Sequence, residues 1–365
     1  MTGESVLALG LMSGTSADGV DAALLTTDGR REVAPGPWLT LPYEPGLRAA
    51  LRAAAGADAG RLHEVERDLT LAHAEAVRRL LAEAEVPAAA VAVIGCHGHT
   101  VRHEPARRRT LQIGDGALLA RACAIDVVCD FRSADVAAGG QGAPLAPLYH
   151  AALAADLDRP VAVLNLGGVA NVTWLGEGDD ILAFDTGPAN ALLDDWAARH
   201  TGEALDRDGA LAAAGKVDER VLAGLLDDPY FAAPPPKSLD RDHFARRAEA
   251  LLAGLGAADG AATLAAFTAA AAALAARHFP APVRRWLAAG GGRHNPALMG
   301  ALARSLGAPP APVEAVGWQG DALEAQAFAY LAVRSLEGLP LSVPAITGVP
   351  APQTGGVLHR ARDVA

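Results

Sequence analysis

The sequence has little cysteine and lacks the features of a secretion signal. Its three cysteines, Cys96, Cys123 and Cys129, lie in apolar runs and form no C-x-x-C pair. This argues against a disulfide framework and against a zinc site. The N-terminal residues MTGESVLALG lack the basic start and the long apolar run of a signal peptide. These absences predict a protein of the reducing cytoplasm.

Positive charge is also scarce. Lysine and arginine number 31 against 42 aspartates and glutamates, which gives a net charge of -11. An acidic chain repels duplex nucleic acid and anionic lipid surfaces. The most apolar stretch, 261–276, is rich in alanine and is shorter than the roughly 20 residues that a membrane span needs. We therefore expect a buried helix there, and neither a nucleic-acid nor a membrane partner.

Two common nucleotide-binding motifs are missing as well. The nearest match to the G-x-x-x-x-G-K-[ST] phosphate loop, at 209–217, has the wrong spacing and lacks the final hydroxyl residue. No G-x-G-x-x-G motif follows a strand-like run. A nucleotide, if one binds, must be held by another architecture.

The order of apolar runs predicts two related α/β units. The length corresponds to two domains at about 150 residues each. The glycine- and proline-rich stretch 131–147 predicts the boundary. We therefore assign 1–132 to a first domain, 133–340 to a second domain and 341–365 to a C-terminal segment. Strand-like runs lie at 6–11, 20–25, 91–96 and 125–129, a similar series restarts at 161–166, 169–175 and 181–184, and helical periodicity marks 62–84 and 322–336.

Both units begin with a strand, a turn of small residues and a second strand. The two segments are LALGLMSGTSADGVDAALL, at 7–25, and AVLNLGGVANVTWL, at 162–175. Small residues let the backbone approach a ligand closely, and successive N–H groups can form an anion-binding concavity. One such turn alone would be an ordinary tight hairpin. Two of them suggest a common ligand.

The richest turn is GLMSGTSADGVD, at 10–21. Its hydroxyl residues Ser13, Thr15 and Ser16, followed by Asp18 and Asp21, suit phosphate oxygens and a hydrated divalent cation. The alternative is a turn whose side chains only satisfy its own backbone. The segment resembles the signature of anhydro-N-acetylmuramic acid kinases, which belong to the superfamily of sugar kinases, Hsp70 and actin.

Further segments resemble the same family, in the same order and over nearly the whole chain. They are CHGHTVRH (96–103), TLQIGDGALLA (110–120), DFRSADVAAGGQGAPLAP (130–147), NLGGVANVT (165–173), FDTGPAN (184–190), GGGRHNPALM (290–299) and LEAQAFAYLAVRSL (323–336). Three departures occur. His99 replaces the usual glutamine, Ala189 replaces a glycine, and Leu239 and Asp240 interrupt a usual Lys-Ser-Thr-Gly-Arg run. Because of the last departure, Lys237 and Arg241 are left out of the predicted site.

The resemblance implies an α/β fold of two ribonuclease-H-like domains, as in actin-like ATPases, with ATP and Mg²⁺ in the cleft between them. It also implies that the C-terminal segment packs back toward the first domain. The implied reaction is the ATP-dependent conversion of 1,6-anhydro-N-acetylmuramic acid to N-acetylmuramic acid 6-phosphate in peptidoglycan recycling. The implied ATP-binding residues are Gly10, Ser13, Gly14, Thr15, Ser16, Asp18, Gly19, Val20, Asp21, Asn165, Gly167, Gly168, Asn171, Gly290, Gly291, Gly292 and Asn295.

Asp185 is the candidate catalytic residue. It follows the apolar run 181–184 and precedes a strand-to-helix turn, where desolvation can keep a carboxylate basic. The alternative is a cap for the following helix. The resemblance favours the general base, which would activate water.

Five residues are candidates for binding the sugar. The resemblance implies that they supply acceptors for hydrogen bonds from the sugar hydroxyl groups and one guanidinium that binds the lactyl carboxylate. Each also has an ordinary structural interpretation, such as a buried histidine, a turn former, an ion pair or a solvated helix face. The five are His97, Thr100, Asp115, Arg132 and Glu324.

Two other functions remain as alternatives. One is a kinase for a different sugar, because the superfamily places unlike substrates in the same cleft. The other is a nucleotide-dependent binding module of the chaperone type, although no peptide-binding domain is expected after the second unit. The partner is expected to be a small-molecule sugar, and a homodimer is left open.

Overall fold

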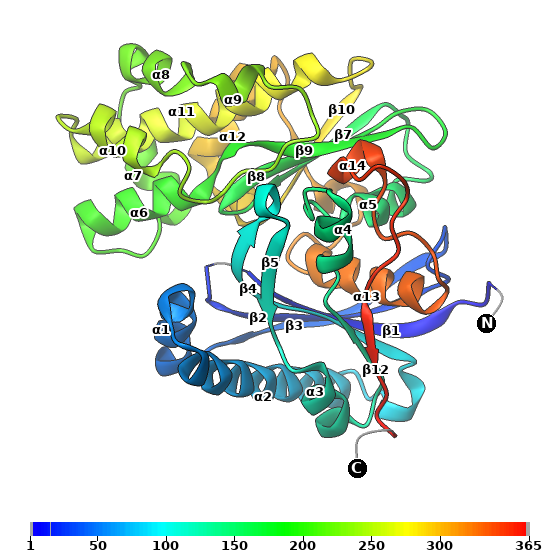
Figure 1. Cartoon of the computed structure of the whole chain (residues 1–365). Helices are drawn as coiled ribbons and strands as arrows, with labels where there is room; N and C mark the ends of the chain where they lie inside the picture. The colour runs from blue at the N-terminus through cyan, green and yellow to red at the C-terminus, as the bar shows by residue number, and fades with distance from the viewer. Residues whose placement is uncertain (1–2, 15, 363–365) are drawn as a thin grey trace. The chain divides into compact units, whose positions relative to one another are not determined.

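The computed structural model describes residues 3–14 and 16–362 and contains two compact units (Figure 1). The first unit combines Met1–Asp156 with Asp321–Ala365, and the second unit is Leu157–Gly320. This division differs from the boundary predicted at 132/133, because 133–156 and 321–340 belong to the first unit. The second unit is therefore inserted into the first.

The first unit contains a mixed seven-stranded sheet in the order β12-β6-β4-β1-β2-β3, with β5 paired to β4. Three consecutive antiparallel strands are followed by β4, parallel to β1, and by β6, parallel to β4. This is the strand order of a ribonuclease-H-like domain. The strands are β1 (Val6–Ser13), β2 (Gly19–Thr27), β3 (Val33–Pro42), β4 (Val93–Glu104), β5 (Arg109–Ile113), β6 (Val127–Cys129) and β12 (Val357–His359).

Helices cover both faces of this sheet, with α2 on one side and α13 on the other (Figure 1). The Asp58 side chain caps α2 by accepting from the Arg61 N–H, and the apolar face of α2 packs into the core. The helices are α1 (Pro45–Ala53), α2 (Ala59–Glu83), α3 (Gly116–Cys123), α4 (Ser133–Ala138), α5 (Pro147–Leu153), α13 (Leu323–Leu336) and α14 (Pro344–Thr347).

Helix α13 lies directly on the backbone of β1 and β4. A Cβ built on Gly10 would lie 1.7 Å from the Ala325 carbonyl oxygen, and one built on Gly95 would lie 2.0 Å from that of Phe328. Only glycine allows such an approach. This packing places α13 in the first unit, whereas the sequence predicts it in the second domain.

The C-terminal segment is also part of the first unit. Strand β12 pairs with β6 at the sheet edge. The buried carboxylate of Asp135 accepts hydrogen bonds from the hydroxyl groups of Ser342 and Thr347 and from the Gly142 N–H. These bonds connect α4 and its following loop to the last segment.

The second unit repeats the same strand order. Its sheet runs β11-β10-β7-β8-β9, with β7, β8 and β9 antiparallel and β10 parallel to β7. The repeat confirms the predicted α/β fold of two ribonuclease-H-like units. The strands are β7 (Val161–Leu166), β8 (Val169–Leu175), β9 (Ile181–Pro188), β10 (Arg285–Ala289) and β11 (Ala311–Pro312).

The core helix of the second unit is α11, the alanine-rich stretch of the sequence. By length and composition it is a candidate membrane span, but 61% of its apolar window is buried inside the protein. It packs against β8, β9 and neighbouring helices, as expected for a buried helix. The helices are α6 (Asn190–Thr201), α7 (Ala210–Ala213), α8 (Glu219–Leu226), α9 (Pro229–Ala232), α10 (Ala245–Leu252), α11 (Ala257–Ala275) and α12 (Pro296–Leu306).

Because α13 lies against β1, adding a single methyl group at Gly10 should destabilise the folded protein strongly. We expect Gly10→Ala to lower the free energy of unfolding by about 3 kcal/mol or more, because backbone must move to accept the Cβ. Urea denaturation measures this change. Gly14→Ala is the matched control, since its Cβ would meet only the Ser16 hydroxyl at 3.9 Å. Equal midpoints for the two variants would contradict the close approach of α13.

Candidate active site

The turn after β1 leaves open space next to its backbone. A Cβ at Gly14 would have no neighbour closer than the Ser16 hydroxyl, at 3.9 Å. Ala17 adopts a left-handed conformation, with φ of 54°, and its N–H donates to the Gly14 carbonyl at 3.0 Å. Thr15 lies outside the described residues. The turn can therefore be approached closely by an anion, as its sequence predicts.

Ser13 supports this turn from inside the protein. Its side chain is buried, and its hydroxyl lies 3.1 Å from Nδ1 of His99 and beside the Tyr43 phenol. Burial lowers the pKa of His99 to about 4, so its ring is neutral at physiological pH. His99 thus gives Ser13 a hydrogen-bonding partner inside the first unit.

Carboxylates gather close to the same turn. Asp18 is exposed and forms an ion pair with Arg48. Asp21 accepts a hydrogen bond from Thr40 Oγ1 at 2.5 Å. Burial raises the pKa of Asp21 to about 6; the Thr40 hydrogen bond opposes the rise, and the negative charges of Glu324 and Asp321 add to it. Such a concentration of negative charge suits a cation.

Three predicted ATP-binding residues of this region have structural roles of their own. Gly10 lies under α13, as described above. Gly19 pairs with β3, where a Cβ would lie 2.5 Å from the Leu41 carbonyl oxygen. The Val20 side chain is fully buried in the core of the first unit. Ser16, in contrast, is exposed at the turn.

The structure brings two predicted sugar ligands together. His97 Nδ1 donates to the Gly98 carbonyl at 2.9 Å, which leaves Nε2 to accept from Arg132 Nε at 3.1 Å and Nη2 at 2.9 Å. Burial and the Arg132 charge hold the pKa of His97 well below its usual value. Arg132 Nη1 also donates to the Gly142 carbonyl at 2.6 Å. The guanidinium is therefore held in one orientation by a neutral imidazole and a loop carbonyl.

The other predicted sugar ligands lie on separate elements of the first unit. Thr100, on β4, accepts from Gln112 Nε2 at 3.2 Å. Asp115 caps α3 by accepting from the Leu118 N–H at 2.9 Å, which supports its interpretation as a turn former. Glu324 lies in the first turn of α13, where its charge acts on Asp21.

In the second unit, polar side chains form a row across three strands. Asn165 on β7 is paired with Asn171 on β8, and Asn171 is paired with Asp185 on β9. Directly paired residues of antiparallel strands place their side chains on the same face of a sheet. The row therefore joins two predicted ATP-binding residues to the predicted catalytic carboxylate.

Two glycine turns flank this row. The carbonyls of Gly167 and Gly168 accept N–H groups from the start of α6, including that of Asn190 at 2.9 Å. A Cβ on Gly290 would lie 2.4 Å from Asn165 Oδ1, whereas one on Gly291 would meet only Asn190 Nδ2, at 3.9 Å. The two turns thus lie together and leave open space at Gly291.

Polar residues hold the second of these turns in place. Gly292 approaches Asn190, and a Cβ there would lie 2.9 Å from its Oδ1. Arg293, which the sequence analysis missed, is buried, pairs with Glu314 at 2.7 Å and donates to the Gly290 carbonyl at 3.0 Å. Asn295 caps α12 through the Leu298 N–H. Asn190 was also missed, although it ends a segment that carries the family resemblance.

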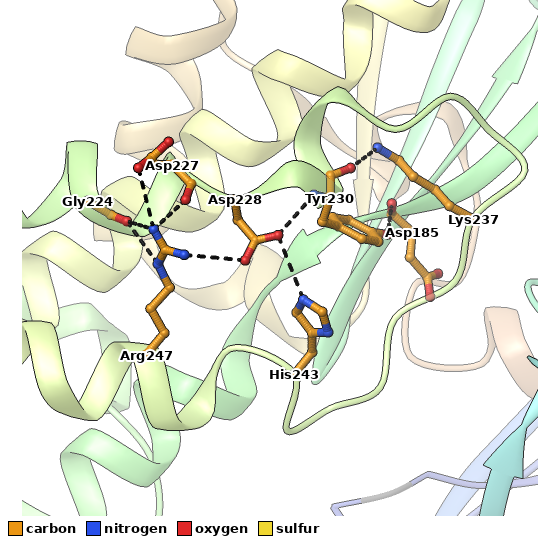
Figure 2. A network of polar contacts seen from close by, with 8 residues as sticks. All are labelled: Asp185, Gly224, Asp227, Asp228, Tyr230, Lys237, His243 and Arg247. Carbon is orange, nitrogen blue, oxygen red and sulfur yellow. Dashed lines mark hydrogen bonds and ion pairs between the residues drawn. The ribbon is translucent and has the colours of Figure 1, made fainter.

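Asp185 lies at a bulge of β9 and is only 7% exposed. Its carbonyl accepts from Tyr230 Oη at 2.6 Å (Figure 2). Its N–H donates to the Lys237 carbonyl at 3.1 Å, and Oδ2 accepts from the Leu239 N–H at 2.7 Å. The N-cap of α6 is Ala189. The alternative of Asp185 as a helix cap is therefore wrong.

The hydrogen bond to the Asp185 carboxylate does not need a particular side chain at position 239. Leu239 reaches Asp185 through its backbone N–H, while its side chain packs against the core of the second unit. Lys237 Nζ donates to the Tyr230 carbonyl at 2.9 Å, and burial lowers its pKa to about 8. Figure 2 shows the Lys237 amine and the Asp185 carboxylate pointing in different directions.

Comparisons with known proteins identify the family. The family model for anhydro-N-acetylmuramic acid kinase matches residues 6–361. The anhydro-N-acetylmuramic acid kinase of Paramagnetospirillum magneticum is 62% identical over 354 residues, which cover 97% of this chain and 99% of the relative. That of Acidiphilium cryptum is 59% identical over 359 residues, covering 97% and 98%. The chain therefore belongs to the anhydro-N-acetylmuramic acid kinase family of enzymes, which confirms the resemblance seen in its sequence.

Proposed function

We propose that this kinase uses ATP and water to convert 1,6-anhydro-N-acetylmuramic acid to N-acetylmuramic acid 6-phosphate during peptidoglycan recycling. The observation that carries the proposal is the placement of Asp185. Its carboxylate is nearly buried, is held by a backbone N–H, and shares a face of the sheet with Asn171 beside two glycine turns. A buried carboxylate so placed is suited to general-base catalysis.

The chemistry requires that one bond of the sugar break as another forms. A 1,6-anhydro sugar has no free 6-hydroxyl group, so its C1–O6 bond must open before O6 can carry phosphate. Asp185 takes a proton from water while the water oxygen attacks C1, and the C1–O6 electron pair leaves with O6. As it departs from C1, O6 attacks the γ-phosphorus of ATP, and ADP leaves. A single carboxylate therefore drives both ring opening and phosphoryl transfer.

The glycine turns fit the phosphates of ATP. Gly14 and Gly291 both border open space that a larger side chain would fill. We propose that the turn at 13–16 and the turns at 167–168 and 290–292 approach ATP through their backbones. That the two units enclose ATP in a cleft stays a prediction.

Mg²⁺ is the expected companion of ATP. Among residues 3–14 and 16–362, no group of three or more His, Cys, Asp or Glu side chains could hold a metal ion. Mg²⁺ commonly binds through substrate phosphates and one or two carboxylates, so the acidic surroundings of Asp21 fit a hydrated ion. The ion would neutralise phosphate charge during transfer.

Arg132 is the proposed ligand of the lactyl carboxylate. His97 and the Gly142 carbonyl already fix its guanidinium, so little side-chain freedom is lost on binding. Thr100, Asp115 and Glu324 stay predicted partners of the sugar. We further propose that the enzyme acts in the cytoplasm without a nucleic-acid or membrane partner, in line with its net charge of -11.

Replacing Asp185 by asparagine tests the mechanism. We expect Asp185→Asn to lower kcat by about 10²–10⁴-fold, because the amide is nearly isosteric but far less basic. Ring opening and phosphoryl transfer should be lost together, as measured by sugar chromatography and ADP release. With the wild-type enzyme in ¹⁸O-labelled water, the label should enter C1. Label in the phosphate would contradict attack of water on the sugar.

Replacing Gly14 by valine tests the phosphate turn. Because the space beside Gly14 is open, the variant should fold normally, while its branched side chain blocks the approach of the phosphates. We expect an increase in the KM for ATP or loss of turnover, with an unchanged melting temperature. Wild-type ATP kinetics in the folded variant would exclude this turn from the ATP site.

Arg132→Ala tests the carboxylate contact. Loss of a charge-assisted hydrogen bond costs about 1.5–3 kcal/mol, which corresponds to roughly ten- to a hundredfold in affinity. We expect this loss for the lactyl-bearing anhydro sugar and a much smaller one for its N-acetylglucosamine counterpart. Isothermal titration with both sugars measures the difference. Equal losses would exclude the carboxylate role.

A further inference from the structure

Strand β9 forms one edge of the second sheet, and no strand among residues 3–14 and 16–362 pairs with its outer side. At Asp185 both the N–H and the C=O bond to groups outside the sheet. Unpaired backbone groups at an edge are costly when they are buried. The segment 228–239 supplies the missing partners at this one position of the edge.

Tyr230 is the residue through which this segment is organised. Its hydroxyl donates to the Asp185 carbonyl, and its own carbonyl accepts from Lys237 Nζ at 2.9 Å. The Lys237 ammonium also lies 4.6 Å from the centre of the Tyr230 ring, a cation–π contact. Burial and the nearby Asp185 charge raise the pKa of Tyr230 above its usual value, so the phenol keeps its proton.

The other side of Tyr230 is anchored to the helices of the second unit. The Tyr230 N–H donates to Asp228 Oδ1 at 2.9 Å. Asp228 Oδ2 lies 3.5 Å from Arg247 Nη1, and Arg247 Nε donates to the Gly224 carbonyl at 3.0 Å. Figure 2 shows the continuous path from Gly224 through Arg247, Asp228 and Tyr230 to Asp185.

We infer that Tyr230 is a positioning residue for the reaction, whose hydroxyl fixes the Asp185 peptide and with it the direction of the Asp185 carboxylate. This inference rests on the proposed role of Asp185. The hydroxyl touches the backbone of Asp185 rather than its carboxylate, so Tyr230 acts through Asp185 and not on the substrate. Lys237 holds Tyr230, and its amine points away from the reacting carboxylate. Small errors in the placement of a catalytic group cost much of its effect.

Tyr230→Phe removes only the hydroxyl and tests the inference. We expect kcat to fall about tenfold, as for loss of one hydrogen bond, while the KM for ATP stays within twofold. Tyr330→Phe is the matched control, because the Tyr330 hydroxyl also donates to a backbone carbonyl, that of Arg30, at 2.9 Å. The control should lose similar thermal stability and keep its kcat. Equal kcat values for the two variants would overturn the positioning role.

A double-mutant cycle separates this inference from the proposed function. In the Asp185→Asn background, Tyr230→Phe should have no further effect on the residual rate, because the group it positions is already gone. Full turnover of Asp185→Asn alone would refute the proposed role of Asp185. Loss of turnover in Asp185→Asn, with additive effects in the double variant, would overturn only the role of Tyr230.

A second variant decides the question if Tyr230→Phe does not fold. Lys237→Met keeps the apolar stem but removes the ammonium that bonds the Tyr230 carbonyl. We expect kcat to fall about threefold with an unchanged KM for ATP, and Lys237→Arg to restore most of the activity, because a cation–π contact and a donor return. An unchanged kcat in Lys237→Met would overturn the inference.

Discussion

The close approach of α13 to β1 and β4 is the constraint on which the first unit depends. Because Gly10 and Gly95 have no side chains, the helix backbone lies against the sheet, and one face of the sheet is closed by a segment from far along the chain. This return of the chain makes the second unit an insertion. It also brings Glu324 and Asp321 close to Asp21, so the acidic surroundings of the first turn result from the same packing.

Glycine serves different physical purposes at positions that look alike in the sequence. Gly10 is needed because a helix lies against it, whereas Gly14, four residues later, borders open space. Gly290 has a positive φ of 74° and packs against Asn165, while Gly291 is exposed. The open space next to Gly14 and Gly291 leaves room for a ligand at these two positions.

The candidate catalytic carboxylate depends on an excursion of the chain rather than on its own strand. Strand β9 places Asp185 on the same face as Asn171, but the hydrogen bonds at its outer edge come from Tyr230, Lys237 and Leu239. Lys237 and Leu239 contribute backbone groups to these bonds, a carbonyl and an N–H. The contact at Leu239 is therefore independent of which side chain stands there, and the sequence departure at this position leaves it intact.

The sequence by itself determined the features that are local along the chain. The repeated order of strand, small-residue turn and strand predicted two related α/β units, because a hairpin is specified by neighbouring residues. The glycine turns could be predicted for the same reason. The ribonuclease-H-like fold of the two units was implied by the family resemblance. The sequence predicted that Asp185 ends its strand, but β9 continues to Pro188 and Asp185 lies at a bulge within it. The ordered segments together identified the family.

Only the tertiary structure decided which distant residues meet. Ser13 and His99 are 86 residues apart, Asp185 and Tyr230 are 45 apart, and His97 and Arg132 are 35 apart. The periodicity of 322–336 predicted a helix but not the sheet that it covers, so α13 was assigned to the wrong unit. Local patterns specify which face of an element is apolar, whereas the choice of partner depends on how whole elements pack together.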